Sequence, residues 1–296
     1  MATREIFWVA EEAATNHILW TGEKVPITTD YAIGKELHLT HDDRFEGLPQ
    51  VTIRIEKQLS IRENKESQAL LVKILSPSAS SGEHPSDLKA GRLPDEVVAK
   101  VWDEGHYSYR DPVDGRPLPT SLEERSFIEA HAYTQLEPLQ GTYLPKFYGY
   151  YFFHPEGEKG RRVNVVLLEY IRGISPLDME ECGSHSMGDI KYDVINETLR
   201  CLNEIHSLGV FHYQVGFQNF LLSFNGDRTS LSRVSLIDFQ NARFRWKKLP
   251  ENLVRMAREF DIKCLERQLQ SGRFMKTKFS TELRAFPEGG IEVPIT

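Results

Sequence analysis

Residues 205–243 of this chain read IHSLGVFHYQVGFQNFLLSFNGDRTSLSRVSLIDFQNAR. Two short apolar runs, residues 220–222 and 234–237, flank a polar turn that contains the triplet Asn-Gly-Asp. Each run adjoins a polar residue that an apolar strand would not select at random: Asn219 precedes the first run and Asp238 follows the second. The stretch therefore predicts a hairpin that holds Asn219 and Asp238 close together at one end.

A carboxylate and an amide oxygen that converge at one point suit a hard divalent cation such as Mg²⁺, which takes oxygen ligands. Asn219 and Asp238 are therefore the candidate metal ligands. The cysteines Cys182, Cys201 and Cys264 show no metal-ligand spacing and are odd in number. They indicate a reduced, cytosolic protein rather than a thiolate metal site or a disulfide framework.

The composition excludes several classes of partner. The chain has 296 residues, of which 27% are charged, and a net charge of −7. This negative balance argues against nucleic acid or an anionic membrane surface as the main partner. We find no secretory signal, and no apolar run approaches the roughly 20 residues of a membrane-spanning helix. We therefore expect a cytoplasmic protein that binds neither nucleic acid nor a membrane.

The part of the chain before residue 172 is predicted to be rich in strands. Five stretches show the alternating or continuous apolar pattern of strands; they are residues 51–61, 68–75, 96–102, 144–153 and 163–171. Residues 77–94 are rich in Ser, Gly, Pro and charge, which is typical of an exposed loop. Residues 1–48 have no strong period and are predicted only as an N-terminal extension.

A lysine and a glutamate stand out among these elements. Ser121 and Glu124 form a capping box at the start of a helix that should end before Pro138. Glu129 interrupts the apolar stripe of this helix, and a buried carboxylate without a partner would cost several kcal/mol. Lys100, on the preceding strand, is the obvious cationic partner. Each residue has an alternative placement: Lys100 extends to solvent, or Glu129 is exposed.

The second half of the chain contains two predicted helices, residues 186–208 and 251–270. The first has an apolar face that includes His206. A histidine in such a stripe indicates a core histidine with satisfied hydrogen bonds more often than a ligand. The tail from Ser271 shows no regular pattern.

The order of these elements resembles the protein-kinase-like fold over residues 51–270. The resemblance is carried by a Val-Ala-Lys strand, a Glu-bearing helix, a Leu-Leu-Glu-Tyr-Ile strand end, a His-containing loop and a final Asp-Phe. It is closest to compact kinase-like and aminoglycoside-phosphotransferase-like proteins common in fungi. It implies an α+β, two-lobed fold, in which an antiparallel-sheet N-lobe with one main helix (residues 49–171) precedes a mostly helical, shortened C-lobe (residues 172–296).

The resemblance also implies roles for individual residues. Lys100 matches the lysine that holds the α- and β-phosphates of ATP, and Glu129 matches its partner on the helix. Asn219 and Asp238 match the two Mg²⁺ ligands. ATP and Mg²⁺ are therefore the implied cofactors.

Three further residues match the part of the family's site that holds the adenine base. Leu168 matches the gatekeeper position. Glu169 and Ile171 match the hinge positions, whose backbone groups hydrogen-bond to adenine.

The departures from the family pattern are equally specific. The catalytic loop begins with His212 and has Gln214 at the position of the catalytic aspartate, and glutamine cannot accept a proton from a substrate hydroxyl. Gly216 replaces a lysine that contacts phosphate, and Gln240 replaces the glycine of Asp-Phe-Gly. The turn at residues 62–67, expected to cover the phosphates, contains no glycine.

Three functional hypotheses follow. The first is a pseudokinase-like module that binds a nucleotide and Mg²⁺, or regulates another protein, without phosphoryl transfer; Gln214 and His212 mark its degenerate catalytic loop. The second is an ATP-dependent phosphotransferase that acts on a small molecule with a degraded but working site. The third is the same scaffold repurposed for non-phosphoryl chemistry on a metabolite. We favour the first.

Overall fold

The computed structural model describes residues 31–45, 50–60, 67–77, 94–106, 121–158, 160–176, 178, 187–225, 230–245 and 251–270. Most of the predicted loop 77–94, most of the turn 62–67 and the tail from Ser271 lie outside these residues. The described strands are β1 Glu36–His41, β2 Gln50–Ser60, β3 Gln68–Pro77, β4 Glu96–Trp102, β5 Phe147–Phe153, β6 Val163–Glu169, β7 Val210–Phe211, β8 Phe220–Phe224, β9 Leu231–Leu236 and β10 Arg243–Phe244. The described α-helices are α2 Leu122–Gln135, α4 Met187–Ser207 and α5 Glu251–Gln270, and short 3₁₀ helices lie at Glu104–His106, Glu137–Leu139 and Phe217–Asn219.

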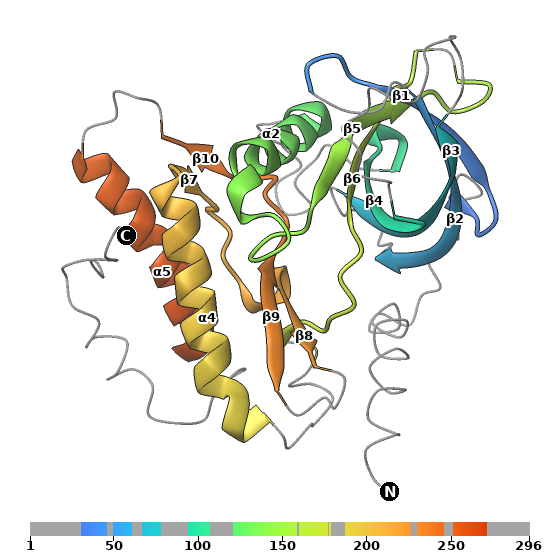
Figure 1. Ribbon diagram of the computed structural model, residues 1–296. Helices are drawn as coiled ribbons and strands as arrows, with labels where there is room; N and C mark the ends of the chain where they lie inside the picture. Colours follow the sequence, from blue (N-terminus) through green and yellow to red (C-terminus); the bar gives the residue numbers. More distant parts are fainter. Residues whose placement is uncertain are drawn as a thin grey trace, which may run out of the picture.

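Six strands form a closed antiparallel barrel in the order β1-β2-β3-β4-β6-β5 (Figure 1). Alternate residues of each strand point into the barrel. The inward side chains form a continuous apolar core to which every strand contributes, with examples in Leu39, Ile53, Val72, Val101 and Leu167. The interior is thus packed with side chains, which places the candidate site on the outside of the barrel.

Strand β1 closes this barrel. Leu37 and Leu39 point inward and are at most 4% exposed, whereas Glu36 and Thr40 point outward. β1 pairs with β2 over five residue pairs and with β5 over two. We predicted no element in residues 1–48, so β1 was missed.

The closed barrel overturns the expected two-lobed protein-kinase-like fold. That fold required an antiparallel-sheet N-lobe and a mostly helical C-lobe. Instead β1 joins β2 to β5, and the described part of residues 172–296 holds two long helices, the β8–β9 hairpin and the short β7–β10 pair. The resemblance to compact fungal kinase-like proteins was wrong for the fold, because motif order does not determine how a sheet closes. The pseudokinase label, which depended on that fold, falls with it.

The individual elements agree more closely with the sequence. β2, β3, β4, β6, the β8–β9 hairpin, α2, α4 and α5 begin and end within a few residues of the predicted bounds. The predicted capping box is confirmed in part, since Ser121 Oγ accepts the Glu124 N–H at 3.1 Å.

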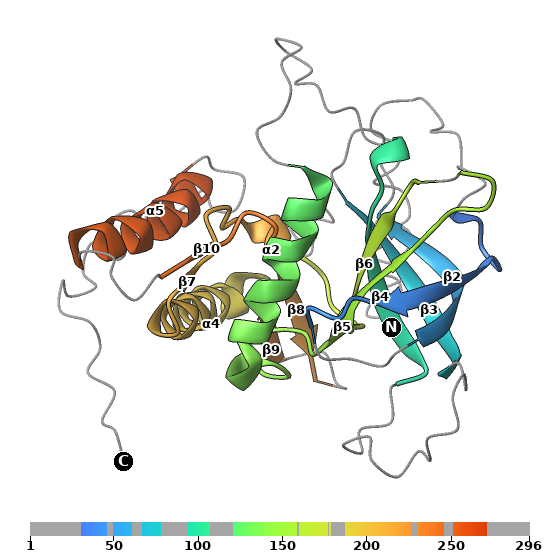
Figure 2. The same cartoon turned by 90° about the horizontal axis from the view of Figure 1, so that it is seen from above.

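A second core lies between the outer face of the barrel, α2 and the remaining elements. Trp102, Val166 and Leu168 contribute from the barrel, and Leu222 and Leu236 from the hairpin. In both ribbon views, α2 lies between the barrel on one side and α4 and α5 on the other (Figures 1 and 2). The surface that carries α2 is therefore the surface on which residues of the barrel and the hairpin meet.

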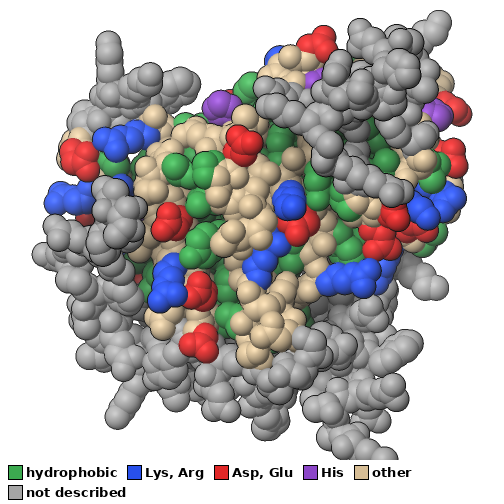
Figure 3. All heavy atoms as spheres, viewed as in Figure 1, with side chains coloured by type: hydrophobic (Ala, Val, Ile, Leu, Met, Phe, Trp, Pro, Cys, Tyr) green, Lys and Arg blue, Asp and Glu red, His purple; other side chains and the backbone are tan. Residues whose placement is uncertain are grey.

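The visible surface shows no segregation of charge. On the face shown in Figure 3, acidic and basic side chains are interspersed. No helix among the described residues is both long and apolar enough to cross a membrane.

Candidate functional site

Lys100 lies in the middle of β4, on the outer surface of the barrel. Its neighbours Ala99 and Val101 point into the barrel core. The alternation of the strand therefore directs Lys100 outward, together with Trp102. The Lys100 side chain is only 12% exposed, which contradicts the alternative that it extends to solvent.

Glu129 faces Lys100 from α2. Its side chain is completely buried, so the alternative of an exposed Glu129 is also wrong. Lys100 Nζ donates a hydrogen bond to Glu129 Oε2. The partner predicted from the cost of burying a lone carboxylate is thus confirmed.

The β8–β9 hairpin brings Asn219 and Asp238 to the same end, as predicted. Phe220 pairs with Leu236, and one step further the Ile237 N–H donates to the Asn219 carbonyl oxygen at 2.8 Å. Lys100 Nζ also donates to Asp238 Oδ1. We call Lys100, Glu129 and Asp238 the Lys100 cluster.

Asp238 has an unusual backbone conformation. Its φ of 72° lies in the left-handed region, which L-residues other than glycine seldom adopt. The next residue, Phe239, is fully buried and packs edge-on against Tyr133, with ring centroids 5.3 Å apart. The burial of Phe239 holds the backbone in this conformation and directs the Asp238 carboxylate toward Lys100. Backbone strain of this kind tends to occur at functional sites.

The Lys100 cluster contains one positive and up to two negative charges. Burial raises the pKa of Glu129 to about 7; Lys100 opposes this shift and Asp238 adds to it. Burial alone would lower the pKa of Lys100, but the charges of Asp238 and Glu129 outweigh burial and raise it. Lys100 is therefore protonated, and a proton or a second cation would neutralise the excess negative charge.

Two aromatic residues beside the cluster were not predicted as site residues. Lys100 Nζ lies 4.9 Å from the centroid of the Trp102 ring, and the buried Trp102 Nε1 has no hydrogen-bond partner among the residues that the structure describes. Tyr133 lies one helical turn after Glu129. Burial, followed by the charges of Glu129 and Asp238, raises the Tyr133 pKa well above its usual value, so its hydroxyl keeps its proton. The spacing of four residues between Glu129 and Tyr133 was the available signal.

His212 positions the loop that follows β7. Its ring is fully buried, with Nε2 3.0 Å from the Ile237 carbonyl oxygen and Nδ1 3.3 Å from the Gln214 backbone nitrogen. A proton on Nε2 satisfies both contacts. Burial lowers the His212 pKa, which favours the neutral ring. Both ring nitrogens are occupied by backbone groups, so the geometry gives His212 a positioning role.

Gln214 is exposed at the edge of the site. Its Oε1 accepts a hydrogen bond from Asn241 Nδ2 at 2.5 Å, and its backbone oxygen accepts one from Asn219 Nδ2 at 2.9 Å. The side chain carries no group that could act as a general base near neutral pH. The loop therefore orients Asn219 but supplies no proton acceptor at this position.

Asp261 on α5 anchors the same loop and was not predicted from the sequence. Its carboxylate is fully buried and accepts the N–H groups of His212 and Tyr213 at 2.9 and 2.7 Å. His206 Nε2 lies 3.0 Å from Asp261 Oδ2, which confirms the prediction that His206 is a satisfied core histidine. The missed signal was an acidic residue on the same helix face as the buried Val254 and Ala257, the pattern that revealed Glu129.

The three residues expected to hold adenine are placed differently from one another. Leu168 is 5% exposed and belongs to the core beneath α2. The Glu169 N–H donates to the Lys146 carbonyl oxygen at 2.8 Å, and its carboxylate pairs with Arg233. Ile171 is 8% exposed. The Glu169 backbone N–H is therefore already hydrogen-bonded within the protein, so it is not free to donate to an adenine base.

The residues present fit a weakly held hard cation. Among the described residues, no group of three or more His, Cys, Asp or Glu side chains could hold a metal ion. Asp238 and Asn219 supply two oxygen ligands at most, and the bond from Asn219 Nδ2 to Gln214 leaves Asn219 Oδ1 as the acceptor. Mg²⁺ commonly binds through one or two carboxylates and completes its shell with water and phosphate oxygens.

Comparison with known proteins adds no further assignment. No protein-family model matches the chain, and no curated protein sequence matches it significantly. The groups that can bind a ligand in this part of the structure are the Lys100 cluster, Asn219 and the loop from His212 to Gln214.

Proposed function

We propose that the chain binds a phosphate-bearing ligand together with a divalent cation at the Lys100 cluster and Asn219. One observation carries the proposal: a single buried lysine is shared between two carboxylates that come from different elements. Such an arrangement is expensive to bury. It becomes favourable when a cation binds beside Asp238 and an anion binds beside Lys100.

The chemistry of the donors favours phosphate and Mg²⁺. A lysine ammonium binds phosphate as a point charge. Asp238 and Asn219 Oδ1 would hold the cation, whose remaining ligands would be water and phosphate oxygens. ATP with Mg²⁺ is the first candidate ligand, because its phosphates can contact Lys100 and the cation together.

Gln214 favours binding over transfer. General acid–base catalysis contributes about 10²- to 10⁴-fold to typical enzymes. Gln214 lacks the required carboxylate, and its amide is hydrogen-bonded to Asn241. The proposed function is thus a nucleotide-binding module, with a small molecule or a regulated protein as the further partner.

The test is a calorimetric titration with ATP, with Mg²⁺ and with both together, accompanied by an assay for ATP consumption. We expect saturable binding of ATP that requires Mg²⁺, without ATP consumption. Asp238→Asn should abolish the Mg²⁺ requirement and weaken binding. The double variant Lys100→Met/Glu129→Gln should abolish binding; it removes the two most buried charges together and leaves only the Asp238 carboxylate, whose side chain is 25% exposed.

Lys146→Gln and Asp193→Asn, both exposed substitutions away from the cluster, are the matched controls. Equal binding by wild type, Asp238→Asn and the double variant would refute the proposal. ATP consumption that disappears in Asp238→Asn would favour an active phosphotransferase over a binding module.

A further inference from the structure

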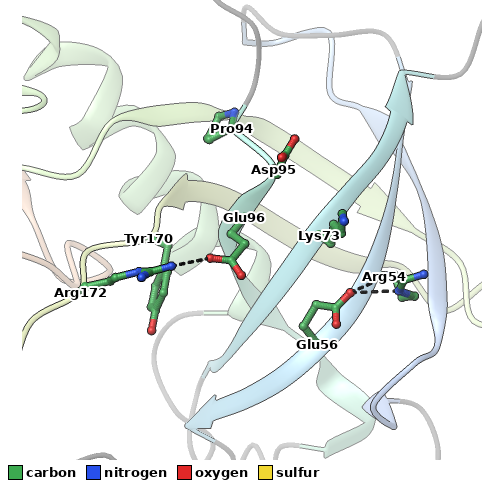
Figure 4. A pocket seen from close by; sticks show the side chains of 8 residues that line it. All are labelled: Arg54, Glu56, Lys73, Pro94, Asp95, Glu96, Tyr170 and Arg172. Atoms are coloured by element: carbon green, nitrogen blue, oxygen red, sulfur yellow. Dashed lines mark hydrogen bonds and ion pairs between the residues drawn. The ribbon is translucent and has the colours of Figure 1, made fainter. Parts of the chain in front are cut away.

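A groove on the outer wall of the barrel contains a second set of charged residues. It encloses about 560 Å³ and is lined by β2, β3 and β4 and by the segment after β6 (Figure 4). This volume falls in the range of small-molecule sites. Glu96, at one end of β4, lines the groove; at about 3.3 Å per residue, Lys100 lies roughly 13 Å further along this strand.

The lining contains three basic and three acidic side chains: Arg54, Lys73, Arg172, Glu56, Asp95 and Glu96. Four of them are already paired. Arg54 bonds to Glu56 at 2.9 Å, and Arg172 bonds to Glu96 at 3.1 Å. These pairs leave one cation and one carboxylate, Lys73 and Asp95.

The strand register explains why Lys73 has no counter-ion among the described residues. Its direct neighbours across the sheet are Arg54 on β2 and Glu96 on β4. Like charges on directly opposed residues repel, and the Glu96 carboxylate is turned toward Arg172, as Figure 4 shows. Among the described residues, the side chains of Lys73 and Asp95 make no hydrogen bond or ion pair.

Lys73 and Asp95 are nevertheless close neighbours. The Ile74 N–H donates to the Asp95 carbonyl oxygen at 3.0 Å, which places Asp95, the residue before β4, one step along the chain from Glu96, the partner of Lys73. Within the part of the chain that the structure describes, the groove therefore presents one free ammonium and one free carboxylate, and the formal charges of its lining balance. A polyanion would be repelled by three carboxylates, whereas a zwitterion would satisfy both free groups.

We propose that this groove binds an aromatic α-amino acid, with its carboxylate on Lys73 and its ammonium on Asp95. The side chain of the ligand would lie against Pro94 and the Tyr170 ring, which provide the apolar part of the lining. Aromatic rings pack favourably on one another in offset or edge-on arrangements. The site is independent of the Lys100 cluster, because the two share no residue.

The experiment is a titration of the full chain with L-phenylalanine, followed by calorimetry and by NMR. Phenethylamine lacks the carboxylate and 3-phenylpropionate lacks the ammonium. We expect saturable binding of L-phenylalanine and a loss of at least about tenfold in affinity for each analogue, since one charge-assisted hydrogen bond is lost in each case.

Lys73→Gln should weaken L-phenylalanine binding at least about tenfold but leave phenethylamine binding unchanged. Asp95→Asn should likewise weaken L-phenylalanine binding at least about tenfold but leave 3-phenylpropionate binding unchanged. Lys146→Gln and Glu156→Gln, which are exposed elsewhere, should change nothing. Three results would each overturn the proposal. They are a lack of saturable L-phenylalanine binding, equal affinity for L-phenylalanine and the two analogues, and unchanged L-phenylalanine affinity in both groove variants. Lys100→Met/Glu129→Gln should keep L-phenylalanine binding, which separates this outcome from failure of the nucleotide site.

Discussion

Asp261 accepts the backbone N–H of His212 at 2.9 Å although the two residues are 49 positions apart. The same carboxylate accepts the N–H of Tyr213, whose φ of 61° lies in the left-handed region. We expect Asp261→Ala to cost about 3 kcal/mol of unfolding free energy, because each buried N–H left without an acceptor costs about 1–3 kcal/mol. Urea unfolding measures this loss. Glu259→Ala, exposed on the same helix, should change stability by less than about 0.5 kcal/mol; an equally small loss in Asp261→Ala would show that the loop holds its shape without this anchor.

Leu39 tests whether β1 is an integral part of the barrel. Its side chain is 1% exposed in the barrel core. We expect Leu39→Ala to cost about 2–5 kcal/mol, the usual range for a leucine removed from a packed core. Thr40→Ala on the outward face of the same strand should cost far less. A loss of under 1 kcal/mol on thermal or urea unfolding would mean that β1 contributes little to the barrel.

Arg233 joins the β8–β9 hairpin to the barrel. Its guanidinium pairs with both carboxylate oxygens of Glu169 and donates to the carbonyl oxygens of Thr142 and Leu144. Lysine cannot reproduce this planar set of donors. We expect Arg233→Lys to cost about 2 kcal/mol, measured by urea unfolding, whereas Arg200→Lys at an exposed pair should be close to neutral. The interpretation fails if the two substitutions have the same effect.

Glu129 and His212 should give opposite pH dependences of stability. The Glu129 pKa is raised to about 7 from 4.5, so its contribution is fully present below pH 4.5 and is lost as the pH rises to about 7. The His212 pKa is lowered from 6.5 by burial, so its contribution is present above pH 6.5 and is lost as the pH falls. The two contributions oppose each other between pH 4.5 and 6.5.

The Glu129→Gln variant should separate these contributions. Relative to wild type, we expect its unfolding free energy to rise by about 3 kcal/mol between pH 4.5 and 7. In the variant alone, stability should fall on acidification below pH 6.5, which is the His212 contribution. Urea unfolding at several pH values gives both curves. Parallel curves for the variant and wild type would show that Glu129 is ionised across the whole range.

Local pattern and the cost of burial identified much of the site. The two apolar runs between Asn219 and Asp238 correctly predicted the hairpin and the proximity of its two polar ends. The unfavourable energy of a lone buried carboxylate correctly paired Glu129 with Lys100. Both inferences use only the period of a helix or strand and the chemistry of one residue.

The closed barrel could not be predicted from local sequence patterns in the same way. Closure of the barrel depends on β1 meeting β5, a pairing between residues more than 100 positions apart in the sequence. The alternation of apolar and polar residues around Leu37 and Leu39 is too short to predict a strand. Asp261 was missed although it follows the same rule as Glu129, because its hydrogen-bond partners are backbone groups that no sequence pattern marks.

β1 and β5 share only two residue pairs, whereas every other two neighbouring strands of the barrel share at least five. The contact between β1 and β5 is therefore the weakest seam of the barrel. When β1 and β5 are paired, each of the six strands has a neighbour on both sides, which limits strand addition by a partner protein. Partial unfolding should begin by separation at this seam, which would leave β5 as an unprotected template for self-association. Recognition by this barrel therefore depends on side chains, and its resistance to aggregation depends on residues 36–41.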